Sequence, residues 1–267
     1  MTLAFPSLPE AGPLRAVLRR EFRDTLINRY FQVFAALSMG GGAASILFSE
    51  GANSIEFLIV QVALYFVSLF ALLAGVSSAQ AEREEWQILF AQPTPRAAYV
   101  LGKFVAYLSI FAVVLLLVFV PSFVSSGNGQ GIVTLYGRTL LLAAIFIALG
   151  LAIGFLARER AQALIVGVSI WLFLLVGLDL VALFAARWEL TQKFPDLWVS
   201  SLMLNPLDCF RIEALFALEQ IPAEAADKTP LASWWITHPT LWFNLITVCW
   251  CAAAIWLASW RLNRWEE

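Results

Sequence analysis

The chain has 267 residues, of which 61% are hydrophobic and 13% are charged. A soluble domain usually carries about 25% charged residues, so this composition excludes an ordinary soluble domain and indicates an integral membrane protein. The formal net charge of −2 says little by itself, because the positions of the charges matter more in a membrane protein. We expect no nucleic-acid partner.

The chain begins with a stretch, residues 1–27, in which apolar side chains recur at helical spacing with arginines elsewhere. This pattern predicts an amphipathic helix on the cytoplasmic membrane surface, and we assign the stretch to an N-terminal interfacial segment. It contains no apolar core of signal-peptide length, so we expect no signal peptide. The apolar face is formed by Leu14, Val17, Leu18 and Phe22.

Long apolar runs follow, and each is a candidate membrane span. A helix crosses the hydrocarbon core in about 20 residues. Lipid offers no hydrogen-bond partner for the backbone, so such a run is expected to be helical. The fold class expected is an all-α integral membrane protein with a single transmembrane domain over residues 1–267. Its six expected transmembrane helices lie at residues 28–49, 56–80, 99–124, 136–157, 162–186 and 240–260.

Lysine and arginine set the expected orientation. With the N-terminus in the cytoplasm, the inner segments hold twelve of these residues and the outer segments hold five. Cytoplasmic loops are enriched in both, so we expect both termini in the cytoplasm. Residues 81–98 then form a cytoplasmic segment between the second and third spans, and residues 187–239 form an extracytoplasmic segment. Within the latter, the apolar spacing in 204–220 predicts a short amphipathic helix.

The cytoplasmic segment is longer and more polar than a simple turn requires. Pro93 and Pro95 break it into two pieces. The first piece, 82–91, combines acidic side chains with large apolar ones. Acidic residues disfavour an anionic lipid surface, so we expect this piece to dock on a protein.

Gly102 and Lys103 resemble the end of a phosphate-binding loop, but that loop needs glycine at 97 and Ser or Thr at 104. The chain has Ala97 and Phe104, so we expect no nucleotide site. Lys103 is expected to anchor the inner end of the third span in the headgroup region. The usual hydrolase and metalloprotease motifs are absent and the sequence has one histidine, so we expect neither enzyme activity nor a cofactor bound by this chain.

Two charged residues lie at membrane depth in the expected spans, Asp179 and Arg138. An ionisable group inside the membrane is a functional candidate by default. The alternative is a structural ion pair between the two. A metal site built from Met203, Cys209 and His238 is a further possibility, because these are soft or borderline ligands, although their spacing is wide.

Small residues in the first expected span indicate close helix packing. Gly40 with Ala44, and Gly41 with Ser45, lie one helical turn apart. Small residues let helices approach closely. The contact could be a seam between two copies of the chain or ordinary packing within one copy.

The cytoplasmic segment resembles that of ABC-2 type transporter permeases, which carry a pattern of Glu, Leu, Pro and Arg at this place, followed by Gly-Lys. The matching residues are Glu82, Leu89, Pro93, Arg96, Gly102 and Lys103. The chain departs from the pattern at Glu84-Glu85, where Gly-Thr is usual. The resemblance extends over the N-terminal helix, the six spans and the long outer segment. It implies the ABC-2 (type V) permease fold.

A second resemblance concerns the outer segment. The stretch "LNPLDCFRI" looks like the Asn-Pro-x-Asp-x-Phe-Arg segment of NosY-type permeases, which serve the maturation of nitrous oxide reductase and its copper-sulfur centre. The N-terminal "REFRDTLINRY" is also similar to that group. The residues implied to meet an extracytoplasmic partner or cargo are Asn205, Pro206, Asp208, Phe210 and Arg211.

The two resemblances together imply a permease subunit in a bacterial inner membrane, surrounded by lipid and present as a homodimer. ATP and Mg would be bound by a separate cytoplasmic ATPase, and a periplasmic accessory protein is a further expected partner. The residues implied to couple to the ATPase are Glu82, Arg83, Glu84, Glu85, Trp86, Leu89, Pro93 and Arg96. The alternatives are an exporter of a peptide, drug or lipid, a proton-coupled transporter that uses Asp179, and a non-transporting membrane anchor.

Overall fold

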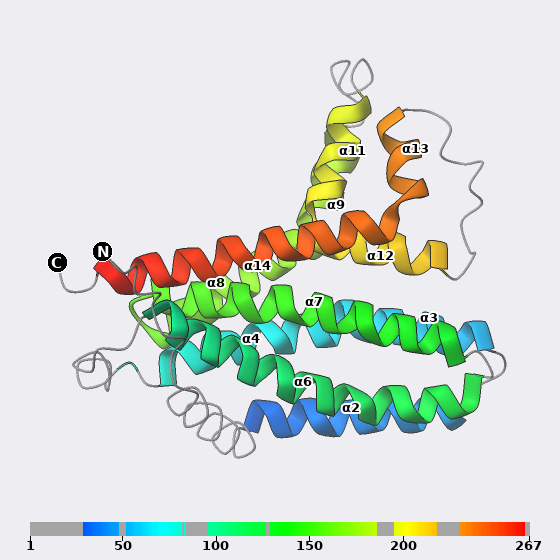
Figure 1. The fold of residues 1–267 in the computed structure, drawn as a ribbon, viewed down its shortest axis with the longest axis horizontal. Helices are drawn as coiled ribbons and strands as arrows, with labels where there is room; N and C mark the ends of the chain where they lie inside the picture. Colours follow the sequence, from blue (N-terminus) through cyan, green and yellow to red (C-terminus); the bar gives the residue numbers. More distant parts are fainter. Residues whose placement is uncertain are drawn as a thin grey trace, which may run out of the picture.

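The computed structural model describes residues 29–47, 52–81, 83, 96–126, 129–185, 195–217 and 230–264. These residues form helices and short links, with no strand among them. Long helices lie side by side, and shorter helices stand off one end of the bundle (Figure 1). The N-terminal amphipathic helix expected in residues 1–27 lies outside the described residues.

The helices include two π-helical turns, η1 and η3, each continuous with the α-helices before and after it. In chain order the elements are α2 (Arg29–Leu47), α3 (Ala52–Val62), η1 (Ala63–Val67), α4 (Ser68–Ala81), α6 (Arg96–Ser126), α7 (Gly129–Leu156), α8 (Arg160–Leu172), η3 (Phe173–Gly177), α9 (Leu178–Ala185), α11 (Pro195–Leu204), α12 (Pro206–Ala217), α13 (Pro230–Thr237) and α14 (Pro239–Asn263).

Within the described residues, five helices are long and apolar enough to cross a membrane, and their positions confirm five of the expected spans. They are Glu56–Ala81, Arg96–Val124, Gly129–Leu156, Arg160–Val181 and Pro239–Asn263. The first expected span corresponds to α2, whose apolar stretch Phe31–Ala44 is shorter than the other spans. The count of six spans and the location of the termini therefore stay predictions.

Helix α7 is the most buried of the five spans, and α4 packs closely against it. Glycines make this approach possible. A Cβ atom added at Gly75 would lie 2.5 Å from the carbonyl oxygen of Ile147, and one added at Gly150 would collide with the carbonyl of Leu72. Small residues at such interfaces let two backbones come together without leaving polar groups exposed to lipid.

Helix α2 packs along α6, and the small residue at the contact differs from those that the sequence indicated. Gly42 is buried against the backbone of Leu117 on α6. A Cβ atom at Gly40 or Gly41 would meet nothing within 4 Å. The packing expected from Gly40 and Gly41 is therefore wrong for the single chain: the rotation of the helix about its axis points Gly42 inward instead.

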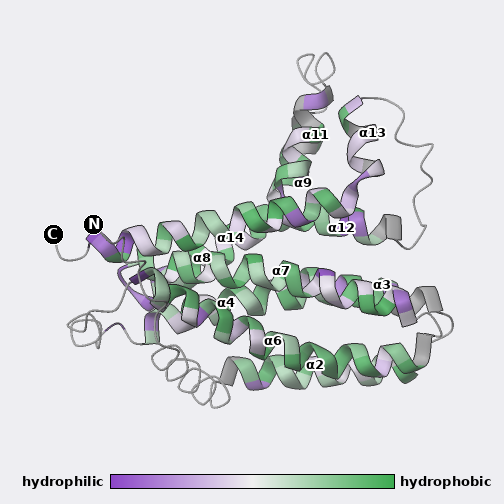
Figure 2. Cartoon of the chain, viewed as in Figure 1, coloured by the Kyte–Doolittle hydropathy of each residue, from purple (hydrophilic) through white to green (hydrophobic). Residues whose placement is uncertain are grey.

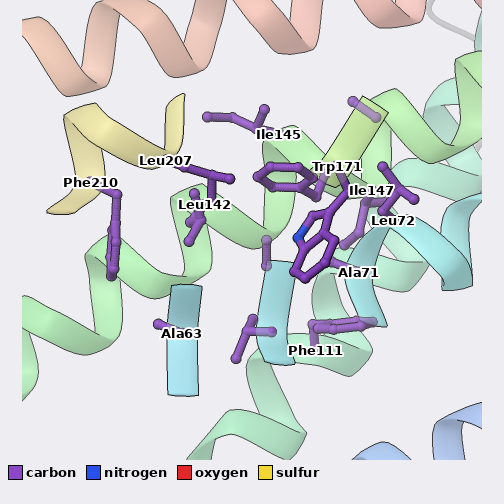
Figure 3. Packing of buried hydrophobic residues seen from close by; sticks show 14 of the residues in the cluster. Ala63, Ala71, Leu72, Phe111, Leu142, Ile145, Ile147, Trp171, Leu207 and Phe210 are labelled. Atoms are coloured by element: carbon purple, nitrogen blue, oxygen red, sulfur yellow. The ribbon is translucent and has the colours of Figure 1, made fainter. Parts of the chain in front are cut away.

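The amphipathic helix expected in the outer segment is confirmed as α12. Asn205 starts it, because its side-chain Oδ1 accepts a hydrogen bond from the backbone N–H of Leu207 at 3.2 Å, and Pro206 occupies the first turn, where no N–H partner is needed. Leu207 and Phe210 are fully buried, and Figure 3 shows them beside Leu142 of α7. Helices α11 and α13 stand away from the bundle above α12 (Figure 1).

Candidate functional site

Figure 2 shows hydrophilic residues toward the two opposite ends of the bundle, with mostly hydrophobic helices between them. One end carries Arg83, Arg96 and the last turn of α14, and is called here the arginine end. The other carries α12 and the first turn of α14, and is called the α12 end. Helices α7 and α14 run from one end to the other.

At the arginine end, Arg83 contacts the end of α7. Its Nη1 donates a hydrogen bond to the carbonyl of Ala157 at 2.8 Å. One turn earlier in the chain, Gln80 Nε2 donates to the carbonyl of Gly154 at 2.6 Å. The last carbonyls of a helix have no partner within the helix and carry partial negative charge, so a guanidinium there satisfies and stabilises them.

Arg96 makes the equivalent contact with α14. Its Nη1 donates to the carbonyl of Leu262 at 2.7 Å, in the last turn of that helix. The two arginines lie near the two ends of the expected coupling segment, 81–98. Each end of that segment is therefore bonded to the end of a different span. The other residues expected to couple to an ATPase lie outside the described residues, namely Glu82, Glu84, Glu85, Trp86, Leu89 and Pro93.

Lys103 does not reach the headgroup region, and the expectation that it anchors the third span there is wrong. The residue is 1% exposed. Its Nζ lies 3.3 Å from the hydroxyl and 3.4 Å from the carbonyl of Ser78 on α4, and 5.3 Å from the ring centre of Tyr99. A buried ammonium is tolerated only where polar partners replace water, so Lys103 joins α6 to α4 at this end.

At the α12 end, Asn205 joins α12 to a π-helical turn. Its Nδ2 donates to the carbonyl of Leu174 in η3 at 2.8 Å, and to Asp208 Oδ2 at 2.5 Å. Wider π-helical turns occur frequently at functional sites. Asn205 is 1% exposed, so its amide group makes hydrogen bonds inside the protein and holds α12 against η3.

Asp208 and Asp179 share one arginine. Arg211 Nη1 lies 3.5 Å from Asp208 Oδ1 and 3.5 Å from Asp179 Oδ2. Asp208 is buried, whereas the side chains of Asp179 and Arg211 are 47% and 31% exposed. The suggested ion pair between Asp179 and Arg138 is therefore not formed, because each side chain has a different partner.

Arg138 pairs instead with Glu213, a residue that the sequence did not single out. Arg138 Nε lies 2.8 Å from Glu213 Oε1, which also accepts a hydrogen bond from the Thr240 hydroxyl at 2.9 Å. Arg138 Nη1 donates to Asn244 Oδ1 at 3.1 Å. The pair thus links α12 to α7 and α14. Its sequence signal is the position of Glu213 on the apolar stripe of α12, three residues after buried Phe210.

Burial raises the pKa of the Glu213 carboxyl above its ordinary value, against the lowering effects of Arg138 and of the Thr240 hydrogen bond. Glu213 is 4% exposed, and its Oε2 atom has no hydrogen-bond partner among the described residues. A buried carboxylate is costly unless it is paired. The arrangement therefore depends on Arg138.

The possible metal ligands Met203, Cys209 and His238 have protein partners. The Cys209 thiol lies 3.0 Å from the carbonyl of Met203, and burial raises its pKa to about 12, which disfavours the thiolate that binds metals. The exposed His238 ring stacks on Trp234 with 5.7 Å between ring centres. The described residues contain no group of three or more His, Cys, Asp or Glu side chains arranged to hold a metal ion.

The stability of the folded chain should depend on whether the Asp208 carboxyl is protonated. Its pKa is raised from 3.8 to about 6, mainly by burial and also by Asp179, against lowering by the Asn205 hydrogen bond and Arg211. The folded state thus binds the proton more tightly than the unfolded state, so the free energy of unfolding should fall as pH rises from about 4 to about 6. Asp208→Asn should flatten this part of the profile, measured by thermal unfolding of the detergent-solubilised chain. Asp196→Asn, at an exposed carboxyl on α11, is the control, and an unchanged profile for Asp208→Asn would contradict the assignment.

A bundle of apolar helices with polar contacts at both ends defines a multi-pass membrane protein. Residues 16–266 match the family model of the ABC-2 family transporter protein, and the chain belongs to this family as a permease subunit. It is similar to a probable ABC transporter permease protein NosY of Pseudomonas aeruginosa, with 28% identity over 93% of this chain and 97% of the relative. It is also similar to the protein of the same name from Stutzerimonas stutzeri, with 27% identity over 76% of this chain and 81% of the relative.

Proposed function

We propose that the chain is the membrane-spanning subunit of an ATP-driven transporter in a bacterial inner membrane, with six spans and both termini in the cytoplasm. The arginine end then faces the cytoplasm, where a separate ATPase subunit binds ATP and Mg. The family supports this proposal, because an ABC permease works with a cytoplasmic ATPase. Two copies of the chain would complete the assembly.

The observation that carries the proposal is that α7 and α14 are each held at two levels, at the arginine end and beside α12. At the arginine end, Arg83 bonds the end of α7 at 2.8 Å and Arg96 bonds the end of α14 at 2.7 Å. At the α12 end, Glu213 contacts Arg138 of α7 and Thr240 of α14. A displacement of the coupling segment would therefore act on two helices that both contact α12.

Motion of the ATPase would thus reach the outer helices along α7 and α14. Helix α12 transmits it further, because Asn205 and Arg211 connect this helix to η3 and Asp179 of α9. Two discrete arrangements of packed helices are the physical requirement for such transmission. The span formed by α8, η3 and α9 would then shift together with the α12 end.

We infer further that the α12 end faces the periplasm and serves a NosY-like role in the maturation of the copper-sulfur centre of nitrous oxide reductase. The names of the two relatives and the Asn205–Arg211 stretch support this reading. Asn205, Asp208 and Phe210 are buried, so they would act by holding α12 in place. A periplasmic partner would contact Arg211 and the exposed parts of α11 and α13, such as Trp234.

The test is co-purification of the ATPase encoded with the chain. Charge reversal at Glu82 and Glu84 to lysine should reduce the ATPase recovered with the chain by at least about tenfold, since like-charge contacts at an interface cost several kcal/mol. Glu159→Lys is the matched control, because Glu159 is an exposed acid at the same end of the bundle. Unchanged recovery with the double variant, in chains that still insert into the membrane, would refute the coupling role. Loss with the control as well would show a general charge effect and would also count against it.

A further inference from the structure

An apolar groove lies on the bundle surface between α7, α8 and α14. Its volume is about 400 Å³, in the range of about 300–1,000 Å³ that is usual for protein ligand pockets. All three helices are candidate membrane spans, so the groove opens toward the hydrocarbon layer. Its lining includes Ile153, Gln162, Val166, Trp250, Ala253 and Leu257.

Arginines stand where the groove reaches the arginine end. On α14 the lining residues Trp250, Ala253 and Leu257 recur at helical spacing, and the next residue of the same stripe is Arg261. Before α8, the backbone N–H of Arg158 donates to the lining residue Gln162 at 3.2 Å. The stripe on α14 therefore passes from the apolar groove to Arg261, and Arg158 directly follows the lining residue Ala157 in the chain.

The charge at this mouth is positive among the described residues. Arg158, Arg160 and Arg264 are exposed and Arg261 is half-buried, against the single exposed acid Glu159. The guanidinium of Arg264 lies 4.4 Å from the ring centre of Trp260, which holds it at this end. Basic pockets between membrane helices bind anionic lipid headgroups.

We propose that this groove binds an anionic phospholipid of the surrounding bilayer. One acyl chain fills the apolar groove beside Trp250 and Ala253, and the headgroup phosphate binds Arg158 and Arg261. A phosphate accepts charge-assisted hydrogen bonds from guanidinium groups, while the chain requires only apolar walls. The site is independent of the proposed transport function.

The charges also favour lipid over a second copy of the chain. Paired copies usually meet about a two-fold axis, with the same patch on both sides. Such a contact here would bring the arginines of the two mouths together and repel. A second apolar groove between α6 and α7 provides the contrast, because its volume is about 150 Å³ and its lining, which includes Phe119 and Val133, is entirely apolar or aromatic.

The test uses the full chain in phosphatidylcholine nanodiscs that contain a phosphatidylglycerol probe with a photoactivatable acyl chain. We expect adducts concentrated on the lining residues of α7, α8 and α14. Labelling should exceed that by the matched phosphatidylcholine probe, with about a fivefold preference for each engaged arginine. Arg158→Gln with Arg261→Gln should remove the preference, and Arg261→Lys should keep part of it.

A steric pair of variants separates the groove from the general lipid surface. Ala253→Phe should fill the groove and reduce labelling there, whereas Ala252→Phe, at an exposed neighbour that does not line the groove, should leave it unchanged. Equal labelling by the two probes would overturn the proposal, as would equal labelling of the groove between α6 and α7. Unchanged labelling with Ala253→Phe would also overturn the proposal. If this variant in addition no longer forms an assembly of two copies, a second copy of the chain is the occupant of the groove.

Discussion

Replacing Arg138 with methionine is expected to lower the free energy of unfolding by about 3–5 kcal/mol, because removing one partner leaves a buried carboxylate without compensation. Glu213 is 4% exposed. After the substitution it would keep the Thr240 hydrogen bond of 2.9 Å but lose the guanidinium at 2.8 Å. The thermal midpoint of the solubilised chain should fall by at least about 6 °C.

The pH dependence gives this prediction a specific signature. Burial already raises the pKa of Glu213 above its ordinary value of 4.5, and Arg138 opposes that shift. In Arg138→Met the Glu213 carboxyl would therefore stay protonated to higher pH. Because the folded state then binds the proton more tightly than the unfolded state, protonation stabilises the folded state at low pH. The loss of stability should be small near pH 4.5 and should grow as pH rises through the raised pKa.

Two further variants test whether the lost charge is the cause. Adding Glu213→Gln to Arg138→Met should recover most of the lost stability, because no unpaired charge then remains. Arg211→Met is the graded control: its ion pairs are 3.5 Å long, the arginine is 31% exposed, and Asp208 keeps the Asn205 hydrogen bond of 2.5 Å, so it should cost less than Arg138→Met. An Arg138→Met effect no larger than that of Arg211→Met would contradict the assignment.

Replacing Gly150 with alanine should disrupt the contact between α4 and α7. The added Cβ atom would collide with the carbonyl of Leu72 and lie 3.0 Å from the backbone N of Val76. These are backbone atoms of a packed helix, which cannot turn aside as a side chain does. Overpacking typically costs about 1–3 kcal/mol, and Gly150→Leu should cost more and reduce the yield of folded chain.

Gly137 is the matched control on the same helix. A Cβ atom there would meet nothing within 4 Å, and alanine is a better helix former than glycine by about 1 kcal/mol. Gly137→Ala should therefore be neutral or stabilising in the same thermal unfolding experiment. Equal effects of Gly150→Ala and Gly137→Ala would show that the close approach of α4 and α7 is not required.

The hydropathy of the sequence predicted five spans that the structure bears out, and the apolar spacing in 204–220 predicted α12, although its start at Asn205-Pro206 was not predicted. These are local properties: a run of apolar residues must be helical in lipid, and apolar side chains at helical spacing predict an amphipathic helix. It was harder to predict which side of each helix faces its neighbours. Gly42, and not Gly40 or Gly41, meets α6, because a uniformly apolar helix carries no signal for its rotation.

The sequence also did not predict which residues the charged side chains contact. An ion pair between Asp179 and Arg138 was one of two alternatives based on their depth, whereas in the structure Asp179 pairs with Arg211 and Arg138 pairs with Glu213. Lys103 was expected in the headgroup region and is buried against Ser78. In each case the partner comes from a different helix, and the choice depends on how the helices are packed.

The sequence by itself determined that this chain is a helical membrane protein, where its apolar helices lie, and which two segments between them are polar. Those properties follow from the transfer of each residue between water and lipid, which is local to the residue. Only the tertiary structure decided that α7 and α14 are joined to the flanks of the coupling segment by Arg83 and Arg96, and to α12 by Glu213. Such contacts join residues far apart in the chain, so they exist only after the helices have packed.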